Sequence, residues 1–201
     1  MRIETDKGAV FVGETQIDHF TVEPLSFTGF AICVNKANEE VGPNENLTKY
    51  LQRERILRQV KAHKKDGTVV PMTAEHLLNM PLAYGKVFTS QLLKDTSPVG
   101  EILESGDGIS APLLYRLGTP IKTGTDDKEI TELEFQAKTF GDIEDILAAE
   151  NHVEKTLKMI ELLGRPVGDF DLLTLPSWAL DQITIVDGSN LMNRVLPSFF
   201  E

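Results

Sequence analysis

The sequence predicts an α+β fold of two tandem units, each a β-hairpin followed by several helices, with more helix than strand. Three observations support this prediction. Two blocks of sequence recur in the same order, alternating apolar residues precede each helical stretch, and 201 residues suffice for two units of about a hundred. Apolar residues at 41% and charged residues at 25% are typical of globular domains.

The first recurring block is residues 17–27, which aligns without a gap on residues 130–140. Both segments read I-x-x-[FL]-x-[VF]-x-x-x-[ST]-F. A second block pairs Gly85 with Gly188, at an offset ten residues shorter than the first. Chance agreement between two amphipathic segments is the alternative to duplication. We favour duplication because the order and the type of the blocks agree.

The repeat divides the chain into an N-terminal α+β unit at residues 1–94, a linker at 95–112, and a C-terminal α+β unit at 113–201. The linker is rich in Gly, Ser, Asp and Pro, residue types that interrupt regular structure.

In the first unit, two short apolar segments flank a polar connection suited to a hairpin, at residues 9–12, 17–22 and 13–16. Apolar spacing then predicts a long helix over residues 47–63, a short helix entered at Thr73 and a helix over 84–93.

In the second unit, strands are predicted over residues 113–121 and 130–135. One helix is predicted over 142–163, because apolar residues recur there at intervals of three and four. A short helix should begin near Pro176, and a closing helix should run over 187–200 with Pro197 bending or ending it.

Charge and composition exclude several classes of protein. The net charge of −11 argues against a nucleic-acid binder, and the acidity is concentrated in residues 111–201, with 8 basic and 16 acidic side chains. No apolar run approaches the length of a membrane span, and no signal peptide is evident. A single cysteine excludes an internal disulfide, so we expect a cytosolic chain.

Residues for metal or catalytic chemistry do not cluster along the chain. The four histidines are scattered, and Cys33 lies on the apolar side of a predicted helix, as a buried hydrophobe would. We therefore expect no catalytic residue, no cofactor and no metal site.

Two surfaces are candidates for partner binding. Apolar residues of the closing helix form two adjacent stripes, a wider surface than one core contact requires. These residues are Leu191, Val195, Leu196, Phe199 and Phe200. Burial of both stripes in a core made by the two halves is the alternative. Basic Arg58, Lys61 and Lys65 share one face of the helix predicted over 47–63 and suit an acidic partner, including the second half of another copy. A solvated helix face is the alternative.

Residues 113–200 combine several short patterns. A Leu117-Gly-Thr-Pro-Ile strand, a polar turn and the strand at 130–135 precede a helix entry at Thr139-Phe-Gly-Asp. The chain then closes on Leu- and Phe-rich helices. This combination resembles the small tail assembly chaperones of contractile-tailed bacteriophages and Mu-like prophages. The first half departs from their single unit, unless it is a diverged second copy.

The resemblance implies a non-enzymatic protein that binds the phage tape measure protein, the tail tube protein or both during tail assembly in the host cytoplasm. Such chaperones are generally absent from the finished particle. A structural tail component of the virion (tube, baseplate or neck) is the first alternative. A cytosolic enzyme with a site assembled from distant residues is the second, and self-association also stays open.

Overall fold

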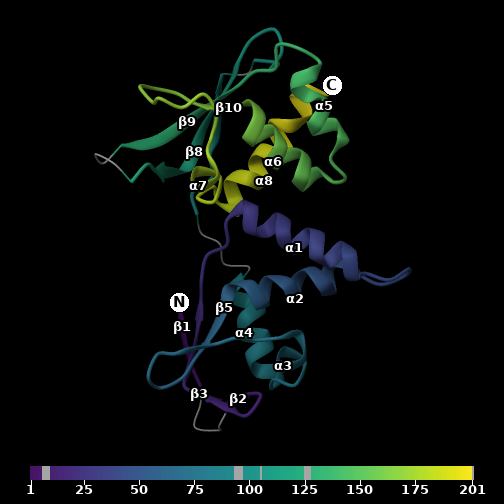
Figure 1. The fold of residues 1–201 in the computed structure, drawn as a ribbon, viewed down its shortest axis with the longest axis vertical. Helices are drawn as coiled ribbons and strands as arrows, with labels where there is room; N and C mark the ends of the chain where they lie inside the picture. Colours follow the sequence, from purple (N-terminus) through teal and green to yellow (C-terminus); the bar gives the residue numbers. More distant parts are fainter. Residues whose placement is uncertain (6–9, 93–96, 105, 125–127, 201) are drawn as a thin grey trace. The chain divides into compact units, whose positions relative to one another are not determined.

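The computed structural model describes residues 1–5, 10–92, 97–104, 106–124 and 128–200 (Figure 1). The fold is α+β, as predicted, with eight α-helices and three antiparallel sheets in the described residues. The chain separates into two compact units. Unit 1 comprises residues 1–25 and 32–96, and unit 2 comprises residues 26–31 and 97–201.

Unit 1 contains a four-stranded antiparallel sheet of order β1-β4-β5-β6 and a separate β2-β3 hairpin. These strands are β1 (Arg2–Glu4), β2 (Val10–Val12), β3 (Thr15–Ile17), β4 (His19–Val22), β5 (Val60–His63) and β6 (Val69–Val70). The hairpin turns at Gly13, whose φ of 60° favours glycine. The strand predicted over residues 17–22 is thus split between two sheets.

The helices that lie entirely in unit 1 are α2 (Leu47–Gln59), α3 (Ala74–Leu78) and α4 (Leu82–Leu92). Helix α1 (Phe27–Glu40) contributes residues to both units. The side chains of Thr73 and His76 form a capping box at the start of α3, as the cap-competent threonine predicted. Phe20 of β4 packs edge-on against Phe88 of α4 in the core.

The prediction of one helix over residues 47–63 was wrong at its end. Helix α2 stops at Gln59, and the chain continues as β5, with Val60 and Ala62 buried against the core. Strand β5 pairs with β4, about forty residues earlier in the chain. Apolar spacing within the segment could not indicate that pairing.

Unit 2 contains an antiparallel sheet of order β10-β9-β8-β7. Its strands are β7 (Glu101–Glu104), β8 (Leu113–Lys122), β9 (Glu129–Phe135) and β10 (Gly164–Pro166). The two strands predicted in this unit are confirmed as β8 and β9. The stretch at 95–112, expected to be a linker, contains β7, which pairs with the start of β8.

The helices of unit 2 are α5 (Gly141–Ala148), α6 (His152–Leu163), α7 (Ser177–Leu180), α8 (Ile185–Arg194) and the 3₁₀ helix η1 (Leu196–Phe199). The single helix predicted over 142–163 is two helices, because Ala149 is extended and Asn151 caps α6. The predicted closing helix is also two elements. Thr184 caps α8, which ends at Arg194, and the turn of η1 contains Pro197.

The two units share part of their order of elements along the chain. Four strands, β1–β4, precede helices α1 and α2, and three strands, β7–β9, precede α5 and α6. In each case the strand after the helix pair, β5 or β10, pairs antiparallel with the last strand before it, and further helices follow. Neither β5 nor β10 was expected. Duplication itself stays a prediction, which superposition of residues 9–93 on 115–196 would test.

Among the described residues, no helix has both the length and the apolar character needed to cross a membrane.

Candidate functional site

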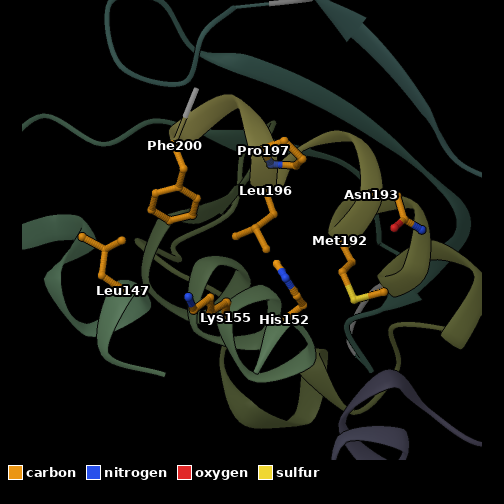
Figure 2. Close-up of a pocket in the computed structure, with 8 residues that line it drawn as sticks. All are labelled: Leu147, His152, Lys155, Met192, Asn193, Leu196, Pro197 and Phe200. Carbon is orange, nitrogen blue, oxygen red and sulfur yellow. The ribbon is translucent and has the colours of Figure 1, made fainter. Parts of the chain in front are cut away.

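A groove of about 680 Å³ lies within unit 2, between the α5–α6 pair and the C-terminal elements α8 and η1 (Figure 2). Its lining is mostly apolar and includes two basic side chains. The lining residues are Leu147, His152, Lys155, Met192, Asn193, Leu196, Pro197 and Phe200.

Different side chains line the two ends of the groove. Phe200 and Leu147 face one another at one end, and Met192 and Asn193 lie at the other (Figure 2). Leu196 lies between the two ends and points toward His152 and Lys155 (Figure 2). Because Leu147 is 41% exposed and Phe200 is 40% exposed, the apolar end of the groove is open to solvent.

Local structure explains why side chains of α6 and Phe200 meet at the groove. The Asn151 side chain accepts hydrogen bonds from the backbone N–H groups of Val153 and Glu154, which ends the α5–α6 connection and starts α6 there. His152 and Lys155 are then three residues apart on one face of α6. Phe200 follows η1 directly, so it reaches the α5 side of the groove.

Most of the closing-helix residues predicted to bind a partner belong to the core. Leu191 and Val195 are completely buried, and Leu196 and Phe199 are almost so. Of the two possibilities that the sequence left open, burial in the core therefore holds for these four side chains. Phe200 alone of the five is exposed, and Leu196 is the buried floor of the groove.

The basic residues predicted to share a helical face do not do so. Arg58 is exposed near the end of α2, Lys61 lies on β5, and Lys65 is exposed in the turn that follows. The Lys61 ammonium donates to the carbonyl oxygen of Arg58. The expected helical face was wrong for the same reason as the helix end, since β5 replaces the last turn.

A buried polar cluster in unit 2 was not predicted. The carboxyl group of Asp187, at the start of α8, is completely buried and accepts five hydrogen bonds. The donors are the backbone N–H groups of Gly100, Gly118 and Thr119 and the hydroxyl groups of Tyr115 and Thr184. Asn190 donates to the Tyr115 hydroxyl and to the Gly100 carbonyl oxygen. Asp187 therefore joins α8 to the sheet.

This cluster explains two glycines of the sequence pattern. A methyl group on Gly118 would collide with the carbonyl oxygen of Pro98, and one on Gly188 would collide with the ring of Phe27. Burial raises the pKa of Tyr115, and the negative charge of Asp187 raises it further, so the phenol stays a donor. We assign the cluster a structural role, because neither Asp187 nor Tyr115 lines the groove.

The remaining titratable groups of interest are separate from the groove. The rings of His19 and His63 stack on neighbouring strands with centroids 4.7 Å apart, and His76 caps α3. Cys33 is buried in α1 as predicted, and burial raises the pKa of its thiol, which disfavours the reactive thiolate. Within the described part of the chain, no three His, Cys, Asp or Glu residues could hold a metal ion.

No protein-family model, curated protein or solved structure matches the chain.

Proposed function

We propose that this chain is a non-enzymatic tail assembly chaperone of a contractile-tailed bacteriophage. It binds the tape measure protein, the tail tube protein or both in the host cytoplasm while the tail is assembled. The observation that carries the proposal is the open, mostly apolar groove between α5, α6 and the C-terminal elements of unit 2.

The groove has the chemistry that an amphipathic helix requires. Helical partners place apolar side chains every three or four residues into such a groove. Met192 and Leu196 supply an apolar floor, and Leu147 and Phe200 supply apolar rims. A tape measure protein is long, apolar and helical, so its exposed segments need an apolar surface that shields them from solvent.

The lining of the groove supports binding rather than catalysis. Its eight residues include one imidazole and one ammonium, but no carboxylate, thiol or hydroxyl side chain. His152 and Lys155 are the groups of this lining that acid–base chemistry could use, and no lining carboxylate orients either of them. The net charge of −11 suits a carrier of apolar segments, since a net charge far from zero favours solubility.

Coexpression with the tape measure protein of the same phage tests the proposal. We expect the wild-type chain to keep the tape measure protein in the soluble fraction as a complex that copurifies. The variant Leu147→Asp with Phe200→Asp places two charges at the open end of the groove. It should fold normally and leave the tape measure protein insoluble.

The matched control is Leu78→Asp, because Leu78 is exposed on α3 in unit 1 and is not part of the groove. Retention of solubility by the groove variant, or its loss in the Leu78 control, would contradict the assignment of the groove. Mass spectrometry of purified particles separates the alternatives. A structural tail component would be present in stoichiometric amount, and a chaperone would not.

A further inference from the structure

The loop that follows β10, at residues 167–174, presents an apolar side chain to solvent shortly after two acidic residues. Leu173 is 88% exposed, more than any other large apolar side chain in the described part of the chain. The loop leaves the sheet after the backbone N–H of Val167 donates to the carbonyl oxygen of Glu132. It then turns at Gly168, whose φ is 124°.

The loop also carries unpaired negative charge. Asp169 and Asp171 are exposed, and neither makes an ion pair within the residues that the structure describes. A single exposed leucine is ordinary on a protein surface. Here the exposed leucine shares a short loop with two carboxylates that make no ion pair. The loop can therefore make both an apolar and an acidic contact with a partner.

The groove of unit 2 has the complementary chemistry. It is apolar at Leu196, Met192 and Phe200, and its polar side carries the basic groups of Lys155 and His152. Lys155 makes no ion pair with any described residue. With Leu173 in the apolar part, Asp171, two residues earlier in the loop, would come toward the ammonium group, a favourable pairing at a partly desolvated site.

The groove and the loop of one chain lie on different sides of unit 2. In Figure 1 the loop, drawn yellow-green after β10, projects away from α5 and from the C-terminal end of the chain, where the groove lies. Both belong to unit 2, so their separation does not depend on unit 1. The loop of one copy can therefore enter the groove only of another copy.

We propose that the loop at residues 167–174 of one copy docks into the groove of a second copy, with Leu173 in the apolar part and Asp171 beside Lys155. The contact joins two different surfaces, so it is heterologous and leaves each pair with one free loop and one free groove. Further copies add to these ends, and the assembly grows with concentration.

This contact regulates the groove, an inference that rests on the proposed function. Without a tail partner, the loop of a neighbouring copy covers the apolar lining and protects it from non-specific association. A partner helix that fills the whole groove buries more apolar surface than one loop, so it displaces the loop. Self-association and partner binding are then mutually exclusive.

Sedimentation velocity of the purified full chain, from about 5 µM to about 500 µM, tests self-association without a tail partner. We expect the wild-type mass to rise with concentration above the 22.3 kDa of one chain. The loop variant Leu173→Asp and the groove variant Phe200→Asp should each stay at that mass. An equimolar mixture of the two should give a dimer and nothing larger, because one intact loop and one intact groove remain.

Circular dichroism and thermal melting confirm that each variant is folded. A wild-type chain that stays monomeric over the whole range would overturn the proposal, as would variants that associate like wild type or fail to dimerise when mixed.

A charge exchange gives an independent measure. Lys155→Glu should weaken association at least tenfold, and adding Asp171→Lys should restore it. Loss of association without this rescue would exclude the pairing of Asp171 with Lys155. Because no tail partner is present, these results are separate from those of the coexpression assay.

Discussion

The hydroxyl of Tyr115 donates a hydrogen bond of 3.0 Å to Oδ1 of Asp187, and both residues are completely buried although 72 positions separate them in the chain. Tyr115 lies on β8 and Asp187 in the first turn of α8. The bond joins the sheet of unit 2 to the helix that leads to the groove. Met192 and Asn193 of the groove lie on this helix.

Replacing Asp187 with Ala should lower the free energy of unfolding by about 3–5 kcal/mol, because several buried donors lose their acceptor together. Tyr115→Phe should cost less, about 1–2 kcal/mol, since it removes one hydroxyl and leaves the other donors bonded to Asp187. Urea denaturation of both single variants and of the double variant measures the coupling between the two residues.

Asp181→Ala is the matched control, because Asp181 is exposed at the end of α7. Its effect should stay within about 0.5 kcal/mol. Equal effects of the Asp181 and Asp187 variants would show that the buried cluster does not stabilise unit 2.

Gly188 and Gly85 align with one another in the predicted sequence repeat, yet their surroundings differ. A methyl group on Gly188 collides with the ring of Phe27, whereas one on Gly85 meets no atom within 4 Å. Gly188→Ala should therefore destabilise the chain by about 1–3 kcal/mol. Gly85→Ala should stabilise it by about 0.5–1 kcal/mol, because alanine favours the helix interior. Thermal melting checks both, and destabilisation by Gly85→Ala would contradict the open space around α4.

The sequence predicted those elements whose signal is local. Alternating apolar residues predicted β8 and β9, and the cap-competent Thr73 predicted the start of α3. Strands β5 and β10 were not predicted, because each follows a helix directly and is defined by pairing with a distant strand. Strand β7 lies in a stretch rich in turn-forming residues, where its pairing with β8 leaves little trace in the sequence.

The candidate site was predicted only in part. Leu196 and Phe200 were named from the closing helix, and both line the groove. The sequence did not indicate Leu147, His152 and Lys155, because the helix predicted over 142–163 has Asn151 in its interior, whereas Asn151 in fact caps α6. An asparagine two residues before an apolar helical run was the available signal. The network of Asp187 had little, since four of its five donors come from residues about 70 to 90 positions away.

Phe199 and Phe200 are adjacent but should respond differently to truncation. Phe199 is buried against Gly108, so Phe199→Ala should lower the free energy of unfolding by about 3–5 kcal/mol. Phe200 is exposed at the groove, and Phe200→Ala should change it by less than about 1 kcal/mol. Chemical denaturation measures both. Similar losses would place Phe200 in the core and would remove it from the proposed docking surface.

The stability of unit 2 should fall in acid through two turn carboxylates. Backbone N–H groups of Ala111 and Ile109 donate to Asp107 and hold its pKa at about 2, and those of Lys138 and Thr139 lower the pKa of Asp142. A carboxyl group with a lowered pKa stabilises the fold above its unfolded pKa. That contribution is lost as the pH falls through the folded pKa. The melting temperature should therefore decline between pH values of about 4 and about 2.

Asp107→Asn with Asp142→Asn removes both titrations while the amide oxygens still accept the turn hydrogen bonds. The double variant should melt lower than wild type at neutral pH and should lose less on going to a pH of about 2, because two of the groups that bind protons on unfolding are gone. Asp181→Asn serves as the control at an exposed carboxylate without such donors among the described contacts. If the melting temperatures of the double variant and of wild type fall in parallel through this pH range, other carboxylates cause the acid sensitivity.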